Sequence, residues 1–266
     1  KVLKPYSSAR DEFEDFDTAE MVFLDANENP FNNGVNRYPD PQQASVKSIL
    51  AKQNNVNPNQ MLLGNGSDEV LDLIFRAFCE PKIDNIITLP PTYGMYGVLA
   101  NINAVENREV LLSTDFQPQI EKIFRAIDDN TKMIFLCSPN NPTGNSFSDE
   151  SVVYLLNNFK GLVVIDEAYI NYSRQKTFIQ ELTEYSNLVI LQTLSKAWGL
   201  AGLRVGMAFA SEEIIEIFNK VKPPYNINEA SQELALEALQ NVDQINNWIK
   251  ETVAEREKLI AKLAQI

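Results

Sequence analysis

The chain has 266 residues, of which 44% are hydrophobic, and it carries a formal net charge of −13 at pH 7. This length suffices for a substantial core in one large domain or two smaller ones, and no apolar run approaches the roughly 18 residues of a membrane span. The acidic balance disfavours a nucleic-acid partner, and the absence of histidine excludes Ser-His-Asp and Cys-His catalysis and histidine-bound metals.

The first part of the chain is predicted to be an amino-terminal arm, residues 1–40. Prolines and asparagine-rich turns dominate its second half, and a short helical pattern follows near residues 43–53. The opening segment has neither the apolar stretch of a signal peptide nor the arginine-rich, acid-poor character of a transit peptide, so we expect a cytoplasmic protein. Cys79 and Cys137 lack ligand spacing, and we expect neither a metal site nor a disulfide.

Short apolar runs alternate with amphipathic segments across the middle of the chain. The runs are residues 61–64, 85–89, 132–137, 162–166, 188–193 and 205–210. Between the first two, Val70, Ile74 and Phe78 recur at helical spacing. Continuous apolar strands between helices predict an α/β fold with a mostly parallel central sheet covered by helices on both faces. We assign this large domain, which is expected to bind the cofactor discussed below, to residues 41–225.

Beyond Pro223 and Pro224 the pattern becomes almost purely helical. The segments "NEASQELALEALQ" and "DQINNWIKETVAEREKLIAKLAQI" continue the helical periodicity up to residue 266. The second segment carries an apolar stripe that includes Trp248, Val253 and Ile260, and such a stripe requires a cover. We therefore expect residues 226–266 to form a helical link and the beginning of an incomplete small domain.

Polar residues follow four of the predicted strands. Lys196 comes just after residues 188–193, Asp166 ends residues 162–166, and the other two strands are followed by "SPNNPTGN" and "NGSDE". Taken alone, each signal has a structural alternative: a solvated loop lysine, a carboxylate that caps a helix, a proline-rich turn and an ordinary helix N-cap. Asp166 could also be the metal-binding aspartate of a nucleotide site, but no GxxxxGK[ST] loop precedes it.

Together these residues predict a binding site for pyridoxal 5'-phosphate. Ligands of open α/β sheets bind outside the carboxyl ends of the strands, so the four strand ends are expected to meet at one edge. They offer a lysine for the cofactor's aldehyde, a carboxylate for its ring nitrogen and a helix N-terminus at Gly66 and Ser67 for its phosphate. Ser195 and Arg204 would add a hydroxyl group and a positive charge at the phosphate.

Several motifs carry a closer resemblance. The chain is similar to the histidinol-phosphate aminotransferases, a family of the fold-type I aminotransferase superfamily, in the motifs "LDANENPF", "NRYPDP", "GNGSDEVLDLIFRAFCEP", "PPTYGMYG", "SPNNPTG", "VVIDEAYI" and "SKAWGLAGLRVG". The last two motifs are typical of the superfamily, whereas "RYPDP" and "PTYGMY" favour this family. The similarity runs from about Pro5 to about Asn228.

The resemblance implies a role for each candidate residue. Lys196 would bond the cofactor's aldehyde, Asp166 would pair with the ring nitrogen, and Tyr169 would bond the ring hydroxyl; these three are the expected catalytic residues. The other expected cofactor-binding residues are Gly66, Ser67, Asp68, Ser195 and Arg204 around the phosphate, Asn141 at the ring hydroxyl and Tyr93 on the ring face. The substrate would meet Asn141, Tyr6 and Tyr38, and Tyr38 would reach the neighbouring subunit's site in a homodimer.

The implied activity is transamination between histidinol phosphate and 2-oxoglutarate, in histidine biosynthesis. The alternatives are an aminotransferase for aromatic amino acids, a threonine-phosphate decarboxylase and a non-catalytic cofactor-binding sensor. The net charge and the lack of a helix-turn-helix segment disfavour the sensor. In the family, an arginine of the small domain binds the α-carboxylate of the amino acid, and we expect a further domain to supply it. Arg10 and Arg37 are the alternatives within the chain.

Overall fold

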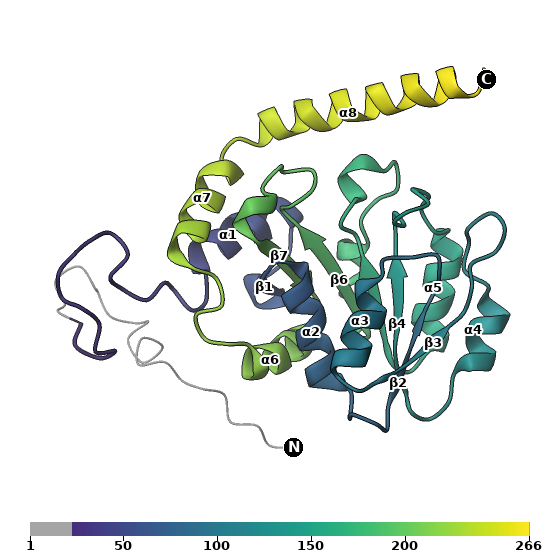
Figure 1. Cartoon of the computed structure of the whole chain (residues 1–266), viewed down its shortest axis with the longest axis horizontal. Helices are drawn as coiled ribbons and strands as arrows, with labels where there is room; N and C mark the ends of the chain where they lie inside the picture. Colours follow the sequence, from purple (N-terminus) through teal and green to yellow (C-terminus); the bar gives the residue numbers. More distant parts are fainter. Residues whose placement is uncertain (1–22, 266) are drawn as a thin grey trace.

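A seven-stranded sheet forms the centre of the molecule (Figure 1). The computed structural model describes residues 23–265 and has the strand order β1-β7-β6-β5-β4-β2-β3. The strands are β1 (Met61–Asn65), β2 (Asn85–Thr88), β3 (Glu106–Glu109), β4 (Thr131–Cys137), β5 (Leu162–Asp166), β6 (Leu188–Thr193) and β7 (Val205–Phe209). β7 pairs antiparallel with β1 and β6, and the other neighbours pair in parallel. The mostly parallel α/β sheet expected from the apolar runs is confirmed.

Helices cover both faces of this sheet. They are α1 (Ala44–Asn54), α2 (Ser67–Phe78), α3 (Met95–Ile102), α4 (Ile120–Ala126), α5 (Asp149–Asn158), α6 (Glu212–Val221), α7 (Glu229–Leu239) and α8 (Val242–Leu263). Single 3-10 turns lie at η3 (Pro58–Gln60), η4 (Ile170–Tyr172), η5 (Phe178–Glu181) and η6 (Ala201–Leu203). α2, α3 and α6 pack on one face, and α1, α4, α5 and α7 pack on the other.

Burial on two faces explains why the strands are continuous apolar runs. In β4, Phe135 packs in the core on the side of α2, and the next residue, Leu136, packs in the core on the side of α1. Successive side chains of a strand point to opposite faces, so a strand covered on both faces needs apolar residues throughout. The runs therefore predict the strands well but do not say which helix covers which face.

The hydrophobic pattern does not predict β3. Its sequence is Glu-Asn-Arg-Glu, it pairs with β2 alone, and it forms one edge of the sheet. Its residues are exposed or half-buried, since an edge strand with little cover needs no apolar run. Charged edge strands also resist pairing with other chains.

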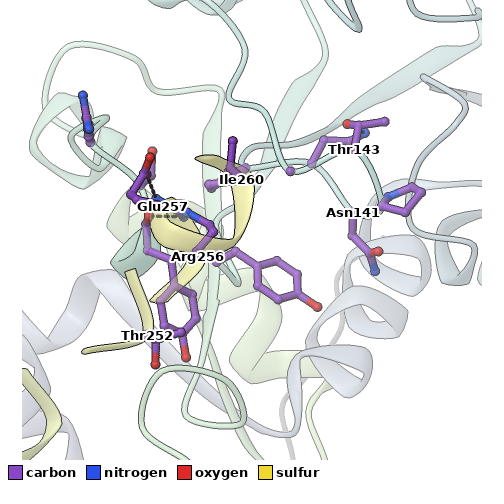
Figure 2. Close-up of a pocket in the computed structure, with 14 residues that line it drawn as sticks. Asn141, Thr143, Thr252, Arg256, Glu257 and Ile260 are labelled. Atoms are coloured by element: carbon purple, nitrogen blue, oxygen red, sulfur yellow. Dashed lines mark hydrogen bonds and ion pairs between the residues drawn. The ribbon is translucent and has the colours of Figure 1, made fainter. Parts of the chain in front are cut away.

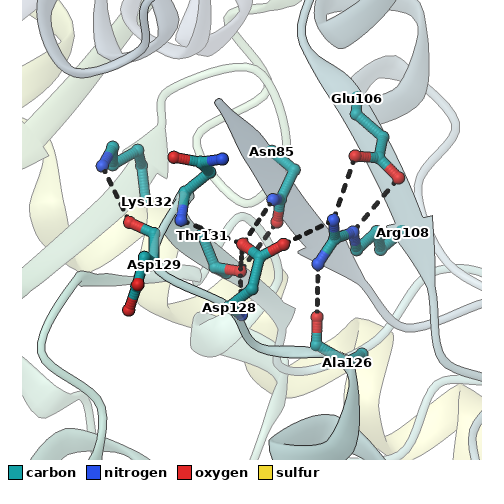
Figure 3. A network of polar contacts seen from close by, with 9 residues as sticks. Asn85, Glu106, Arg108, Ala126, Asp128, Asp129, Thr131 and Lys132 are labelled. Atoms are coloured by element: carbon teal, nitrogen blue, oxygen red, sulfur yellow. Dashed lines mark hydrogen bonds and ion pairs between the residues drawn. The ribbon is translucent and has the colours of Figure 1, made fainter. Parts of the chain in front are cut away.

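The amino-terminal ends of β2 and β4, together with β3, carry a closed polar network (Figure 3). The Asn85 side chain donates to Asp128 Oδ1 over 2.9 Å and accepts from Thr131 Oγ1 over 2.8 Å. Arg108 forms ion pairs with Asp128 at 2.7 Å and with Glu106 at 3.1 Å. The hydrogen bonds of Asn85 and Arg108 hold the pKa of Asp128 well below its usual range. These side chains satisfy one another, so the network stabilises the sheet without any ligand.

The last helix and the arm lie outside the sheet layers. α8, yellow in Figure 1, contacts η4 and buries Ile245, whereas Trp248, Ile260 and Leu263 are exposed. In the arm, Tyr38 stacks on Tyr225 with ring centroids 4.4 Å apart. Within the described residues, 23–265, no helix is both long enough and apolar enough to cross a membrane.

Candidate active site

A pocket of about 160 Å³ lies at the carboxyl ends of β1, β4, β5 and β6. Nine of the ten expected cofactor-binding residues line it: Ser67, Asp68, Tyr93, Asn141, Asp166, Tyr169, Ser195, Lys196 and Arg204. The tenth, Gly66, lies directly against the Arg204 guanidinium. Residues from distant parts of the sequence thus meet at one edge of the sheet, as the strand-end argument requires.

One end of the pocket is suited to an anion. α2 begins at Ser67 after Gly66, whose φ of 82° places it in the left-handed region. A Cβ at residue 66 would lie 2.6 Å from Arg204 Nη2, so glycine is needed for this close approach. The free N–H groups of the first helical turn and the Arg204 guanidinium face the same space, which is the usual protein setting for a phosphate. Arg204 is only loosely paired inside the chain, at 3.9 Å from Asp68.

The other end is suited to a cation. Asp166 ends β5, is 4% exposed and accepts hydrogen bonds from the Tyr96 hydroxyl at 2.8 Å and the Ala168 N–H at 3.1 Å. Burial raises the pKa of Asp166, although the two hydrogen bonds and the Lys196 ammonium oppose this effect. A buried carboxyl whose ionised form is penalised gains the most from a positive charge placed beside it. A protonated ring nitrogen supplies such a charge.

The polar side chains between these two ends have few partners in the chain. The Lys196 ammonium lies 5.3 Å from the centre of the Tyr169 ring, and within residues 23–265 it has no hydrogen bond or ion pair. Side-chain hydrogen bonds are likewise absent, within that range, from Asn141, Tyr169 and Ser195. Asn140, the neighbour of Asn141, is buried and bonds Pro91 and Thr143. The chain therefore uses one asparagine to hold the loop and leaves the other for a ligand.

These features fit pyridoxal 5'-phosphate. The cofactor has a phosphate, a basic ring nitrogen and an aldehyde, and the pocket offers an anion cradle, a buried carboxylate and a primary amine in one space. Tyr93 forms part of the pocket wall, and its hydroxyl donates to Asp68 Oδ1 over 3.1 Å. Burial and Asp68 raise the pKa of Tyr93 to about 12, so its hydroxyl stays protonated at neutral pH.

A larger cavity of about 810 Å³ adjoins this pocket and shares Asn141 and Tyr169 with it. In Figure 2, Asn141 and Thr143 lie on one wall, and Arg256 and Ile260 of α8 lie on another. Arg256 holds α8 in place, because its guanidinium donates to the Tyr172 carbonyl over 2.9 Å. The pocket thus opens into a second, larger space that could hold a further ligand.

Two residues near the site have no role in the sequence predictions. Tyr96 is fully buried, and its hydroxyl donates to Asp166. In the sequence it is the second tyrosine of "PTYGMY", three positions after Tyr93, and this motif was the signal that could have pointed to it. Glu167, beside Asp166, accepts hydrogen bonds from Thr177 at 2.6 Å, from the Phe178 N–H at 2.8 Å and from Gln192 at 2.9 Å. Burial raises the pKa of Glu167 to about 7. Glu167, which directly follows β5, thereby connects this strand to β6 and to the segment at Thr177 and Phe178.

The predicted substrate residues are placed differently. Tyr38 does not line the pocket of its own chain; it is 48% exposed and lies on the arm. Arg37 forms an ion pair with Glu28 at 2.7 Å and also lies on the arm. Tyr6 and Arg10 lie outside the described residues. Within one chain, the structure brings together the expected cofactor-binding residues, Asn141 among them, but not Tyr38 or Arg37.

Comparisons with known proteins agree with this geometry. The family model for aminotransferase class I and II matches residues 13–266. The chain is 71% identical to the histidinol-phosphate aminotransferase of Flavobacterium johnsoniae, in a match that covers all of this chain and 76% of the relative.

Two solved structures are also similar. The histidinol-phosphate aminotransferase of Clostridium acetobutylicum matches with a TM-score of 0.77 and 25% identity, covering 87% of this chain and 70% of that one. The Sinorhizobium meliloti enzyme in complex with pyridoxal-5'-phosphate matches in fold, with a TM-score of 0.78 and 24% identity over 84% of this chain and 62% of that one. The chain belongs to the histidinol-phosphate aminotransferase family, within the class I and II aminotransferases.

Proposed function

We propose that the chain catalyses pyridoxal phosphate-dependent transfer of an amino group between histidinol phosphate and 2-oxoglutarate, in histidine biosynthesis. The observation that carries the proposal is the single pocket that holds a lysine, a buried carboxyl group and an anion cradle in a member of this family. The relative at 71% identity favours transamination over decarboxylation or a sensor role, because its name states that reaction.

In this proposal the chain's residues divide the work by position. Ser67, Ser195 and Arg204, with the N–H groups at the start of α2, bind the cofactor's phosphate. Asn141 and Tyr169 bond the ring hydroxyl, and Tyr93 packs on the ring face. Asp166 keeps the ring nitrogen protonated, since a carboxylate beside a cation favours the charged form. When bound, the protonated ring supplies an electron sink for the bond that breaks at the substrate's α carbon.

Lys196 is proposed to hold the cofactor's aldehyde and, once the substrate's amine replaces it, to act on the proton of the α carbon. A lysine can serve as general base when its amine is neutral and lies beside the proton that it removes. The cation–aromatic contact with Tyr169 and the absence of an ion pair inside residues 23–265 leave its side chain available for both tasks.

We further propose a cytoplasmic homodimer. Tyr38, which is exposed on the arm and does not line the pocket of its own chain, is proposed to serve the partner's site. Both cysteines are free thiols, which suits a reducing compartment. We also keep the proposed division into an arm (1–40), a cofactor-binding domain (41–225) and a helical link with the start of a small domain (226–266).

Chemical labelling tests the assignment. Borohydride reduction of the cofactor-loaded protein should fix the cofactor on Lys196, as seen by peptide mapping. Asp166→Ala should retain the cofactor yet lose nearly all transamination with histidinol phosphate and 2-oxoglutarate. A label on another residue would refute the role of Lys196. Activity of Asp166→Ala within a few-fold of the unsubstituted protein would refute that of Asp166, and preference for another donor in a panel of amino donors would change the substrate.

A further inference from the structure

Tyr96 is a buried tyrosine whose hydroxyl has a specific partner in the active site. It lies in the first turn of α3, is 0% exposed, and its hydroxyl donates to Asp166 Oδ2 over 2.8 Å. A buried hydroxyl without a hydrogen-bond partner destabilises a fold, so phenylalanine would be the simpler residue for packing alone. Phe75 and Phe135 occupy neighbouring positions of the same core. The hydroxyl at residue 96 therefore requires an explanation beyond packing.

Packing holds the Tyr96 ring in one place. The ring stacks on Phe135 with centroids 5.0 Å apart and planes 17° apart, and it meets Tyr93 edge to face at 5.5 Å. Aromatic contacts of this kind fix both the position and the tilt of a ring. These contacts hold the Tyr96 side chain in one orientation, with its hydroxyl directed at Asp166.

Tyr96 and Ala168 between them restrain both carboxyl oxygens of Asp166. The Ala168 N–H donates to Oδ1 over 3.1 Å, while Tyr96 donates to Oδ2 over 2.8 Å. Both donors favour the ionised form of the carboxyl, and they oppose the effect of burial on its pKa. The side-chain donor at this buried position is thus a neutral hydroxyl.

We propose that Tyr96 is a positioning residue for Asp166: its hydroxyl orients the carboxylate and keeps it ionised, ready for the ring nitrogen of the cofactor. This inference rests on the proposed function, because it assumes that Asp166 meets that nitrogen. It assigns Tyr96 no contact with the cofactor or the substrate. α3 and the residue just before its N-cap would then serve the site twice, through Tyr93 at Asp68 and through Tyr96 at Asp166.

Other titratable groups also surround Asp166. They are Asp68 of α2, Tyr93 before α3, Cys137 of β4, Glu167 and Tyr169 after β5, and Lys196 after β6. Lys196 favours the ionised carboxyl, whereas Asp68 disfavours it. Tyr96→Phe leaves all of these groups in place and removes one donor to Asp166, together with the contact between the Tyr96 hydroxyl and the Cys137 thiol. The stacked ring is kept, and the variant should fold.

The test measures cofactor binding and the state of the ring nitrogen, separately from activity. Cofactor-free Tyr96→Phe should bind pyridoxal phosphate about tenfold more weakly than the unsubstituted protein at pH 6, the loss expected for one hydrogen bond to a charged group. The ratio of the two dissociation constants should shrink as the pH rises, because a donor that favours the ionised carboxyl matters less where the carboxyl is already ionised. Using this ratio cancels the titration of the cofactor's own groups.

Cofactor labelled with 15N at the ring nitrogen supplies the second readout. Its NMR shift should report a protonated nitrogen in the unsubstituted protein and a smaller protonated fraction in Tyr96→Phe. Tyr154→Phe, which makes the same change on an exposed face of α5, should alter neither measurement. A merely structural role for Tyr96 would lower the urea midpoint but would leave the 15N shift and its pH dependence unchanged.

Asp166→Asn and the double variant complete the design. If Tyr96 acts through Asp166, Tyr96→Phe should have little effect on affinity or on the 15N shift once residue 166 is asparagine. An equal effect in both backgrounds would overturn the inference, as would unchanged binding and an unchanged 15N shift in Tyr96→Phe. If Asp166→Asn itself leaves the 15N shift unchanged, the proposed role of Asp166 fails first, and the inference about Tyr96 falls with it.

Discussion

The central sheet carries similar side chains at the amino-terminal ends of its strands, here called the amino-terminal edge, and at their carboxyl ends, the carboxyl edge. The two groups of side chains are arranged in opposite ways. At the amino-terminal edge, Asp128 accepts a hydrogen bond from Asn85 at 2.9 Å and pairs with Arg108 at 2.7 Å. At the carboxyl edge, Lys196 has no ion pair in the described part of the chain, and Arg204 stands 3.9 Å from Asp68. Both edges hold an arginine, an aspartate and an asparagine, yet the first is closed and the second is open.

The difference indicates which polar clusters await a ligand. Buried or half-buried polar groups cost free energy unless they are hydrogen-bonded. The amino-terminal edge meets this requirement internally and needs nothing more. At the carboxyl edge, the chain satisfies Asp166 through Tyr96 but leaves the lysine, Asn141 and the helix N-terminus with free hydrogen-bonding capacity. That combination favours a small, highly polar ligand over a structural network.

The largest expected effect is the loss of Lys196. Lys196→Ala should reduce transamination by about 10³-fold or more, since it removes both the covalent anchor and the general base. Lys132→Ala is the matched change at the other edge, where Lys132 pairs with Asp84 at 3.4 Å, and it should leave turnover near that of the unsubstituted protein. Steady-state rates with histidinol phosphate would decide the matter, and comparable losses in both variants would break the comparison between the edges.

A second pair of variants concerns the two arginines. Arg204→Ala should weaken pyridoxal phosphate binding by about 10- to 100-fold, because one charge-assisted contact to the phosphate is lost. Arg108→Ala should lower the urea midpoint of unfolding instead, since its ion pairs lie within the sheet edge. Equilibrium titration of cofactor-free protein and urea unfolding separate the two outcomes. An affinity loss in Arg108→Ala as large as that in Arg204→Ala would contradict the assignment of the phosphate site.

Subunit mixing shows whether the open edge is completed by a second chain. Tyr38→Phe and Lys196→Ala should each be impaired. Random mixing makes about half of the dimers hybrids, and each hybrid has one intact site of two, so the mixture should regain about a quarter of the full activity. The measurement is activity after the two variants are dissociated together and reassociated. Activity no higher than the mean of the two parents would show that Tyr38 does not serve the partner's site.

The smallest effects concern stability, and the two edges should respond to pH in opposite directions. Burial raises the pKa of Glu167 from 4.5 to about 7, so its contribution to stability is complete below pH 4.5 and is lost as the pH rises through 7. The pKa of Asp128 is lowered from 3.8, so its contribution is present above that pH and is lost as the pH falls further.

Urea midpoints between pH 3 and pH 8 test these slopes. Glu167→Gln should flatten the decline above pH 4.5, and Asp128→Asn should flatten the loss at acid pH. Each substitution should leave the other slope intact, because the two residues lie at opposite edges of the sheet. If Glu167→Gln leaves the decline unchanged, burial of this carboxyl is not its cause.

Much of the fold and many residues of the candidate site could be predicted from local patterns. Strands buried on both faces need unbroken apolar runs, so β4, β5 and β6 are visible in the sequence. Parallel strands also bring their carboxyl ends to one edge, which is why the amino-acid sequence alone suffices to group Asp166, Asn141 and Lys196. The polar edge strand β3 has no such pattern and could not be predicted.

The sequence by itself determined the layered α/β architecture and the set of side chains at the carboxyl edge, because hydrophobic periodicity and strand direction are local properties of the chain. Only the tertiary structure decided which of these side chains have partners. Tyr96 and Asp166 are 70 positions apart, and their 2.8 Å hydrogen bond follows from how α3 packs against the sheet. Asn140 and Asn141 are adjacent and chemically identical, yet one is held by Pro91 and Thr143 and the other faces the pocket. The direction of a side chain and the burial around it depend on contacts between distant segments, and no local pattern encodes them.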